Sequence, residues 1–573
     1  MQLVRINLNK ESVKLEDITE DSKYFLLGGR GITSQIVYDE IDDAKCDPLG
    51  KKNKLIIASG LLTGSPFPNS GRSSVGGKSP LTSAVKEANV GGRTSMMLAL
   101  HGIRALIFEE ASDNLKIILI NQNDDIKFNS AEEYKGFGNY KLHEVLRKRF
   151  GDKIGIYSIG PAGEFKMKSA SVAANDLEGY PSRHAARGGL GAVMGSKNVK
   201  AIVILPAKKS KIKIHDLKKF RALSKPFAMF LSESREVFST YGTSLLTKVI
   251  NQHGGLPTRS FRMGTFKDAE KISGEKLHEL VLFRKGKKRV SCSPTCAIKC
   301  SNIIVDKNGK HITSSLEYET IALNGSNCMI NDLDAISKID QLCDDVGIDT
   351  IEFGVTIGVA MDAGKIRWGD TKRVFEILEE ICKGSNIGKL YGNGVCYLGK
   401  EIKYKRIPQV KGQGISGYDP RVFKGMSVTY ATSPMGADHT AGAAIAGRTA
   451  RKDRDYGELS DNKHKLELSY ELQIYTAVLD AMGCCYFIGP SYENMELIAG
   501  AINAMYGTSL TREDVINLGK EIIKTEIEFN NKAGISQATN DLPEFLKLEL
   551  SEPTNLTVTF SKDELRNFWL SRL

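Results

Sequence analysis

The chain has 573 residues, of which 41% are hydrophobic and 26% charged, and a formal net charge of +11. This composition excludes collagen-like, disordered and coiled-coil proteins, and the sequence has no run of about 20 apolar residues that could span a membrane. Because single hydrophobic cores stop growing at roughly 250–300 residues, the length predicts two to four domains. The chain starts without an apolar stretch of signal-peptide length, so we expect a cytoplasmic protein.

Residues 1–208 are rich in glycine and in short β-branched runs. The segments 115–122, 153–160 and 199–207 are typical of strands separated by turns. The basic, apolar-poor segment 208–216 predicts a hinge and a domain boundary. We therefore expect a β-sheet-rich N-terminal domain.

Helical periodicity dominates from residue 209 onward. A stretch punctuated by Gly and Pro at 406–425 marks a second boundary, so the expected domains are 1–208, 209–415 and 416–573. The clearest helical segments are 333–347, 371–384, 466–483 and 512–534. The sequence thus predicts an α+β fold in which one β-sheet-rich domain precedes two mainly helical domains.

One six-residue pattern, Asp-x-x-Gly-x-(Asp/Cys), occurs twice, at 344–349 and 480–485. Each copy follows a run with helical period, and its glycine is placed where a left-handed residue would end that helix. An aspartate in the last turn faces the negative end of the helix dipole, which costs about 0.3 kcal/mol or more. The repetition indicates a function, because a carboxylate there could accept paired hydrogen bonds from a flat, guanidine-like donor.

Ten cysteines are too few for a disulfide framework, but Cys292, Cys296 and Cys300 lie within nine residues. Their polar neighbours argue against simple core packing. Zinc usually takes paired C-x2–4-C units, whereas an iron–sulfur cluster takes four thiolates, often three close together and one remote. The spacing favours an iron–sulfur cluster with Cys485 as its fourth ligand, and zinc stays open as the alternative.

Three glycine-rich segments lie in the expected first domain, at 28–31, 89–93 and 183–198. None is a P-loop or a complete dinucleotide-binding G-x-G-x-x-G motif. Together with Arg72 and Arg187 they indicate backbone amides and guanidinium groups gathered around phosphates.

The densest basic cluster directly precedes the three cysteines and comprises Arg284, Lys285, Lys287, Lys288 and Arg289. Nucleic-acid binders usually interleave such residues with aromatic ones, so we expect no nucleic-acid partner. The cluster is either a solvated loop or a docking surface for an acidic protein.

In these motifs the chain resembles the tungsten-containing aldehyde:ferredoxin oxidoreductase family. The matching segments follow the family's order along nearly the whole chain: GGRG, SGRSSVGGKSPLT, EANVGGR, ARGGLGAVMGSKN, EYET, both Asp-x-x-Gly motifs, GADH and LPEF. The resemblance implies one tungsten, or sometimes molybdenum, between two pyranopterins. It also implies Mg²⁺ between the pterin phosphates and a [4Fe–4S] cluster nearby.

The resemblance also implies roles for individual residues. Cys292, Cys296, Cys300 and Cys485 would ligate the cluster, and Asp344 and Asp480 would each hydrogen-bond one pterin ring. The other residues implied in pterin, phosphate and magnesium contacts are Arg72, Asn89, Gly91, Arg183, His184, Ala186, Arg187, Ile348, Asp349 and Cys484.

For catalysis, the resemblance implies a histidine and a glutamate near the metal. His439 matches the histidine, and both Glu317 and Glu319 are candidates for the glutamate. We choose Glu319 because it aligns with one insertion between the cysteines and Asp344. The implied reaction is the oxidation of a small aldehyde to a carboxylic acid. Its electrons would pass to an acidic ferredoxin or an iron–sulfur electron-transfer subunit.

Three features depart from the family pattern. The cysteine spacing is C-x3-C-x3-C where C-x2-C-x3-C is usual, which predicts a different loop around the cluster. Met435 takes the place of an arginine, and Ala441 lies near the place of a lysine. The loss of two cations weakens the contacts to dianionic phosphates or moves them elsewhere.

Three alternative functions stay open, of which the first comes from the same family. One is a low-potential reductase subunit like that of benzoyl-CoA reductase, and another is a non-catalytic iron–sulfur electron-transfer or scaffold protein. A zinc-ribbon binding protein is the third. The family also implies a homodimer or a hetero-oligomer.

Overall fold

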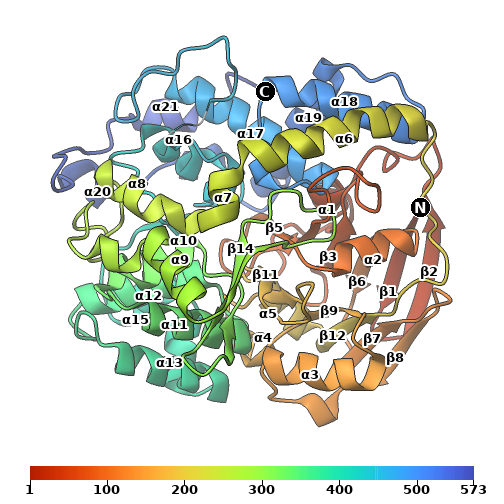
Figure 1. Cartoon of the computed structure of the whole chain (residues 1–573), viewed down its shortest axis with the longest axis horizontal. Coiled ribbons are helices and arrows are strands. Elements are labelled where there is room, and N and C mark those ends of the chain that lie inside the picture. Colours follow the sequence, from red (N-terminus) through yellow and green to blue (C-terminus); the bar gives the residue numbers. More distant parts are fainter. Residues whose placement is uncertain (446, 448) are drawn as a thin grey trace.

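The computed structural model describes residues 1–445, 447 and 449–573 (Figure 1). Its first third contains two six-stranded sheets. The first sheet has the strand order β2-β1-β6-β3-β4-β5. Its strands are β1 (Gln2–Asn7), β2 (Ser12–Asp17), β3 (Leu55–Ser59), β4 (Ser73–Lys78), β5 (Val85–Val90) and β6 (Ile103–Glu109).

The second sheet has the order β11-β10-β9-β12-β7-β8. Its strands are β7 (Lys116–Ile120), β8 (Ile126–Ser130), β9 (Gly155–Ser158), β10 (Val172–Ala174), β11 (Arg183–Ala185) and β12 (Val199–Ile204). The strands predicted at 115–122, 153–160 and 199–207 are therefore confirmed. The helices of this third are α1 (Gly29–Glu40), α2 (Thr94–Leu100), α3 (Asn139–Phe150), α4 (Pro161–Glu164) and α5 (Leu190–Ser196).

Successive side chains of a strand point to opposite faces of its sheet, and this alternation explains how the two sheets and α1 stack. On β3, Ile56 and Ala58 join the core that contains Ile32 and Ile36 of α1, whereas Leu55 points to the opposite face. That face shares a core with residues of the second sheet. The first sheet is therefore sandwiched between α1 and the second sheet.

The rest of the chain is mainly helical, as predicted. Its middle part contains α6 (Leu217–Ser234), α7 (Glu236–Tyr241), α8 (Leu246–Gln252), α9 (Gly274–Phe283), α10 (Tyr318–Asn324), α11 (Leu333–Val346), α12 (Thr350–Asp362), α13 (Thr371–Lys383), α14 (Asn386–Gly392) and α15 (Val395–Glu401). The last part contains α16 (Lys424–Thr432), α17 (Lys465–Met482), α18 (Tyr492–Tyr506), α19 (Arg512–Lys532), α20 (Glu544–Leu548) and α21 (Lys562–Arg566).

Small sheets interrupt these helices. One sheet has the order β13 (Lys287–Val290), β14 (Ser301–Val305) and β15 (His311–Thr313), and a two-residue hairpin joins β16 (Gln409–Val410) to β17 (Gln413–Gly414). One continuous apolar core runs through both helical parts. α6 packs along α18 (Figure 1). The first helix of the middle part of the chain therefore lies on the last part in space.

The α+β fold class is confirmed by this arrangement, while the boundaries at 208/209 and 415/416 stay predictions. α12 is buried on all sides from Ile351 to Met361, as expected for a helix without a polar face. Among the described residues, no helix combines the length and apolar character that a membrane span needs.

Candidate cofactor centre and active site

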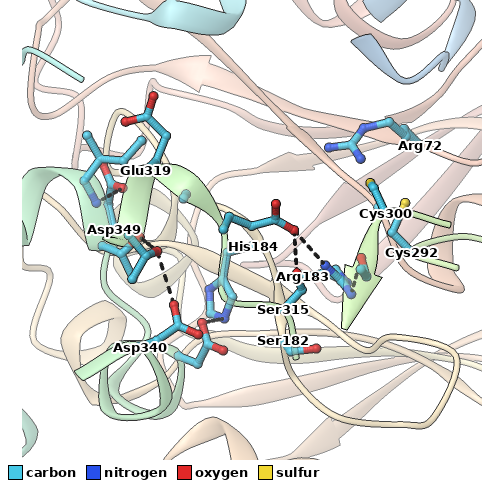
Figure 2. Close-up of a pocket in the computed structure, with 18 of the residues that line it drawn as sticks. Arg72, Ser182, Arg183, His184, Cys292, Cys300, Ser315, Glu319, Asp340 and Asp349 are labelled. Atoms are coloured by element: carbon cyan, nitrogen blue, oxygen red, sulfur yellow. Dashed lines mark hydrogen bonds and ion pairs between the residues drawn. The ribbon is translucent and has the colours of Figure 1, made fainter. Parts of the chain in front are cut away.

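A cavity lies where the N-terminal sheets meet the helices of the other two thirds (Figure 2). It has two adjoining compartments with volumes of about 290 and 530 Å³. The residues that line both compartments are Arg72, His184, Ala186, Glu317, Glu319, Ile351, Cys485 and Phe487. The cavity thus brings together side chains from all three expected domains.

Both Asp-x-x-Gly motifs end a helix at the cavity wall. Asp344 lies in the last turn of α11, and Asp480 lies in the last turn of α17. Gly347 and Gly483 follow with φ angles of 74° and 73°. These left-handed residues confirm the predicted helix ends.

A basic side chain of the N-terminal third lies beside each of these aspartates. His184 Nε2 is 3.1 Å from Asp344 Oδ1, and Arg30 Nη1 is 3.3 Å from Asp480 Oδ2. Arg30 also donates two hydrogen bonds, at 2.8 and 2.9 Å, to Glu526. Burial raises the pKa of Asp480 well above its ordinary value, and Arg30 offsets part of this rise. For Asp480, the guanidine-like donor expected from the motif is the side chain of Arg30.

The GGRG segment at 28–31 serves close backbone packing. A Cβ atom on Gly29, whose φ is 42°, would lie 2.1 Å from the carbonyl oxygen of Asp480. A Cβ on Gly60 would lie equally close, 2.1 Å, to the backbone nitrogen of Gly483. Only glycine permits these contacts. None of residues 28–31 is among the described residues that line the cavity, so its phosphate-binding interpretation gains no support.

Arg72, Asn89 and Arg183 form a polar wall of the cavity. Arg72 Nε donates to Asn89 Oδ1, and Arg183 Nη2 donates to Ser301 Oγ at 3.0 Å. Asn89 Nδ2 and Arg183 Nε are buried without a hydrogen-bond partner among the described residues. Because a buried unpaired donor is costly, this wall fits an anionic group, such as a phosphate, held in the cavity.

Arg187 lies at the second compartment and is fixed from several sides. Its Nη1 and Nη2 donate to the carbonyl oxygens of Ala437 and Gly414 at 2.7 and 2.6 Å. Its Nε lies 3.4 Å from Asp349 Oδ2, and neither of these two buried atoms has a hydrogen bond within the described residues. The guanidinium is therefore held from two sides, and its Nε–H makes no hydrogen bond within the described residues.

The remaining predicted cofactor residues divide into two groups. Gly91, Ala186 and Ile348 line the cavity. Cys484 is buried but is not among the described lining residues, and its backbone N–H donates to the Leu479 carbonyl at 2.9 Å. A cofactor role for Cys484 stays a prediction.

Three predicted cluster ligands lie in one hairpin loop. β13 and β14 pair antiparallel, with Val290 opposite Ser301. The loop that they enclose, here called the cysteine loop (residues 291–300), carries Cys292, Cys296 and Cys300. Two of these cysteines line the first compartment together with the residue at 485, the predicted fourth ligand.

Hydrogen-bond donors and positive charge surround the cysteine sulfur atoms. The backbone N–H of Lys299 donates to Cys296 Sγ at 3.3 Å, and the N–H two residues after Cys485 donates to its Sγ at 3.4 Å. A hydrogen bond from Cys296 and the charge of Arg72 lower the pKa of Cys292. A hydrogen bond to Cys292 raises the pKa of Cys296, and burial raises the pKa of Cys300 and Cys485. In the protein alone, the thiolate form that binds iron is therefore favoured at Cys292 and not at the other three cysteines.

The arrangement of the cysteines bears on the choice between a cluster and a single metal ion. Over residues 1–445, 447 and 449–573, no three His, Cys, Asp or Glu side chains form a group that could hold one metal ion. The zinc alternative, which needs close tetrahedral ligands, therefore gains no support. A [4Fe–4S] cluster needs sulfur atoms spread around a cavity. Cys292, Cys300 and Cys485 line the first compartment, whereas Cys296 is not among the described lining residues. A cluster at these cysteines stays a prediction.

The two predicted catalytic residues meet in the second compartment. His439 Nε2 lies 3.5 Å from Glu319 Oε1, and the backbone N–H of Gly417 donates to Glu319 Oε2 at 2.7 Å. Burial raises the pKa of Glu319, although His439 lowers it in part. Glu319 Oε1 and His439 Nδ1 are both buried without a hydrogen-bond partner among the described residues. These atoms are available to a bound molecule.

Glu317 has different surroundings from Glu319. Thr243 and Ser315 donate to its two carboxylate oxygens, the second at 2.7 Å. Arg183 Nη1 lies 4.0 Å away. Both carboxylate oxygens of Glu317 therefore already accept hydrogen bonds from the protein, whereas the carboxylate of Glu319 faces His439.

Sequence reasoning missed a buried ion pair behind His439. Lys86 Nζ lies 2.6 Å from Asp438 Oδ2, and the Lys86 side chain is fully buried. Asp438 Oδ1 accepts hydrogen bonds from the backbone and side chain of Thr440, so it caps the turn His439–Ala441. Met435 packs against β5, the strand that contains Lys86. Its sulfur accepts a hydrogen bond from the backbone N–H of Glu87 at 3.4 Å. Met435, which takes the place of the family's arginine, thus contacts Glu87. The neighbouring residue in the chain, Lys86, is a buried cation.

Sequence profiles of known families match most of the chain. The profile described as "Aldehyde ferredoxin oxidoreductase, N-terminal domain" matches residues 3–206, and that described as "Aldehyde ferredoxin oxidoreductase, domains 2 & 3" matches residues 227–567. The chain belongs to the aldehyde ferredoxin oxidoreductase family. The resemblance drawn from the motifs is therefore confirmed.

Relatives within the family include tungsten-containing aldehyde ferredoxin oxidoreductases. The protein of that name from Pyrococcus furiosus is 32% identical over 97% of this chain and 92% of its own length. The one from Thermococcus kodakarensis has the same identity and coverage. A Pyrococcus furiosus protein named aliphatic sulfonate oxidoreductase, WOR-like subunit, is 26% identical over 91% of this chain and 84% of its own.

A solved structure has the same fold. It is a chain of the active site complex BamBC of benzoyl coenzyme A reductase, in complex with 1,5-dienoyl-CoA. The TM-score is 0.81 at 19% identity, covering 100% of this chain and 93% of that chain. At this identity the match shows the shared fold of an aldehyde ferredoxin oxidoreductase family member and nothing about its substrate.

Proposed function

We propose that this chain oxidises a small aldehyde to a carboxylic acid in the cytoplasm, at a tungsten (or molybdenum) bis-pyranopterin, and passes the electrons through a [4Fe–4S] cluster to an acidic ferredoxin. The observation that carries the proposal is one cavity that holds the Glu319–His439 pair and also three of the four expected cluster cysteines. Relatives that are 32% identical and named tungsten-containing aldehyde ferredoxin oxidoreductases support the same activity.

The unpaired polar atoms around the cavity fit this cofactor. Asp344 and Asp480 would hold the pterin rings, and Arg72, Asn89 and Arg183 would hold the phosphates with Mg²⁺. When bound, the tungsten pterin group accepts the electron pair that the substrate gives up.

The protein's own contribution is to orient the substrate and handle protons. Aldehyde and water give a carboxylic acid, two electrons and two protons. Burial raises the pKa of Glu319, which makes its carboxylate a stronger base than that of an exposed glutamate. His439, 3.5 Å away, receives that proton in turn or orients the aldehyde oxygen.

A low-potential reductase of the benzoyl-CoA reductase type is the second candidate. It follows from the family resemblance, and the shared fold with a chain of the BamBC complex is compatible with it without favouring it over aldehyde oxidation. Such an enzyme would reduce an aromatic thioester instead of oxidising an aldehyde. Substrate therefore separates the two candidates directly.

The decisive experiment combines metal analysis with turnover of anaerobically purified protein. We expect about one tungsten or molybdenum and about four irons per chain, little zinc, and aldehyde-dependent reduction of benzyl viologen. Iron without tungsten or molybdenum, even after growth with tungstate, would favour an electron-transfer or scaffold role. Turnover of an aryl-CoA and not of aldehydes would favour the reductase.

A matched pair of variants tests the cluster assignment. Cys485→Ser removes a predicted ligand and should lose most of the iron. Cys328→Ser changes another buried cysteine, whose sulfur donates to backbone carbonyls of α10 and α12 and lines neither compartment of the cavity among the described residues, and it should keep the iron. Equal iron content in the two variants would contradict the assignment.

A further inference from the structure

A basic and apolar surface covers the outer side of the cysteine loop. Three of its apolar side chains are unusually exposed: Phe283 by 86%, Val237 by 59% and Leu282 by 49%. Exposed cations adjoin them on β13 and the flanking turns. We call this set the hairpin surface; it comprises Val237, Leu282, Phe283, Lys285, Lys287, Lys288, Arg289 and Lys299.

The hairpin surface is directly connected to the predicted cluster ligands. β13 is an edge strand, and its last residue, Val290, comes two residues before Cys292. α7 lies over the cysteine loop, where Ser239 donates to the Ile298 carbonyl. A Cβ on Gly242, which follows α7, would lie 2.9 Å from the carbonyl oxygen of Cys300. The segments that form the hairpin surface therefore contact the cysteine loop directly.

Part of the positive charge of this surface is not neutralised within the chain. Lys287 pairs with Glu178 at 3.1 Å, and Arg289 pairs with Glu236 at 3.3 Å. Lys285, Lys288 and Lys299 are exposed and have no ion-pair partner in the part of the chain that the structure describes. Their charge is available to another molecule.

We propose that the hairpin surface docks an acidic, one-electron iron–sulfur carrier. The proposal rests on the proposed function, because it assumes a cluster at the cysteine loop. Each aldehyde oxidised releases two electrons, which leave one at a time and reduce two carrier molecules in succession. An apolar centre with a charged rim is the usual composition of an interface, and opposite charge speeds the encounter of the two proteins.

A structural role for the same lysines makes a different prediction. Lys288 lies on the exposed edge strand β13, where a lysine can prevent edge-to-edge pairing of sheets, and Lys285 lies just before it. In that case their replacement by glutamate, which is also charged, would leave reaction with any carrier unchanged. Carrier kinetics therefore distinguish the two roles.

The test uses the loaded enzyme and two electron acceptors, a small acidic ferredoxin and benzyl viologen. Lys285→Glu with Lys288→Glu should lower kcat/KM for ferredoxin about tenfold at low ionic strength and flatten its salt dependence. Viologen reduction should not change. Phe283→Ser should raise the KM for ferredoxin about tenfold with the same salt dependence as wild type.

The control reverses the charge of two lysines in the N-terminal third, one on the edge strand β8 and one shortly after it. Lys127, on the edge strand β8, and Lys135 are equally exposed and lack ion-pair partners among the described residues. Lys127→Glu with Lys135→Glu changes the net charge by the same amount and should leave ferredoxin kinetics as in wild type. An equal loss in the control, or an unchanged rate in the hairpin variant, would overturn the docking proposal.

Failure of the proposed function gives a separate result. If wild-type enzyme reduces neither acceptor with any aldehyde, the activity is wrong, and docking is then measured as binding. Calorimetric titration of oxidised ferredoxin into the iron-loaded chain should show binding that Lys285→Glu with Lys288→Glu weakens about tenfold. Equal affinities for wild type and variant would overturn docking on its own.

Discussion

Glu319 is the residue whose surroundings best suit proton transfer, and its pKa determines the expected pH dependence. Because burial raises this pKa, the carboxyl group is protonated at low pH and cannot accept a proton. We expect kcat/KM of the loaded wild-type enzyme to fall as pH falls through the raised pKa. Glu319→Gln should lower kcat/KM at neutral pH by about a hundredfold or more and abolish that acidic limb.

Glu317→Gln provides the matched control, two residues along the same segment. Its partners, Thr243 and Ser315, can still hydrogen-bond an amide. The control should retain the acidic limb of the viologen assay. A lost limb in Glu317→Gln with a retained one in Glu319→Gln would exchange the roles of the two glutamates.

Lys86 should stabilise the molecule by neutralising Asp438. Lys86→Met leaves a buried carboxylate without its strongest partner, so we expect the free energy of unfolding to fall by about 3–5 kcal/mol. Lys86→Met combined with Asp438→Asn should recover part of that loss, because asparagine still caps the turn at Thr440. Urea denaturation measures both variants, and a double variant no more stable than the single one would contradict the pairing.

At the scale of single residues, the sequence predicts the residues of the motifs but not the buried residues that hold them in place. Glu319 and His439 are identified only through the resemblance, since a lone histidine or glutamate carries no signal of its own. Lys86 gives no sign of burial, because its partner Asp438 lies 352 residues away. A lysine in a strand is ordinarily taken as exposed, and only tertiary pairing makes it a core residue.

Among the elements, the two helices that end at Gly347 and Gly483 make the sharpest stability prediction. A Cβ on Gly483 would lie 2.4 Å from Thr63 Oγ1 and 2.8 Å from Gly60 Cα. Gly483→Ala therefore adds a clash to the cost of a left-handed alanine, about 1–2 kcal/mol. We expect a clearly larger loss of unfolding free energy than this cost alone.

Gly364 supplies the control for that substitution. It follows α12 with a similar φ of 69°, and its Cβ would meet nothing within 4 Å among the described residues. Gly364→Ala should cost only the left-handed backbone term of about 1–2 kcal/mol in chemical denaturation. Equal losses at the two glycines would show that α17 and the N-terminal third pack less tightly than the structure indicates.

Periodicity predicts elements better than it predicts their neighbours. The strands at 115–122 and 199–207 and the helices at 333–347 and 466–483 match observed elements. The basic run gave no strand signal, yet 287–290 forms the edge strand β13, because pairing with β14 overrides its charged composition. Packing of α6 on α18 likewise depends on contacts that no local pattern contains.

At the scale of the whole molecule, cofactor loading should stabilise the chain. The cavity wall contains buried donors and acceptors without hydrogen bonds, such as Asn89 Nδ2 and Arg183 Nε. A group that satisfies them binds only the folded state and so raises its stability. Protein from tungstate-supplemented anaerobic cultures should unfold several degrees above protein from unsupplemented ones in a thermal melt. Identical melting temperatures, with the metal content verified, would contradict this expectation.

The pairing of Arg30 with Asp480 also determines when this molecule can be completed during its synthesis. The two residues are 450 positions apart, and Glu526, the other partner of Arg30, is farther still. At about 5–20 residues per second, a ribosome needs roughly 20–90 seconds to cover that separation. During that time the surface of the nascent N-terminal third that α17 and α19 later cover is still without these partners, and the cavity cannot close until Asp480 and Cys485 have been made.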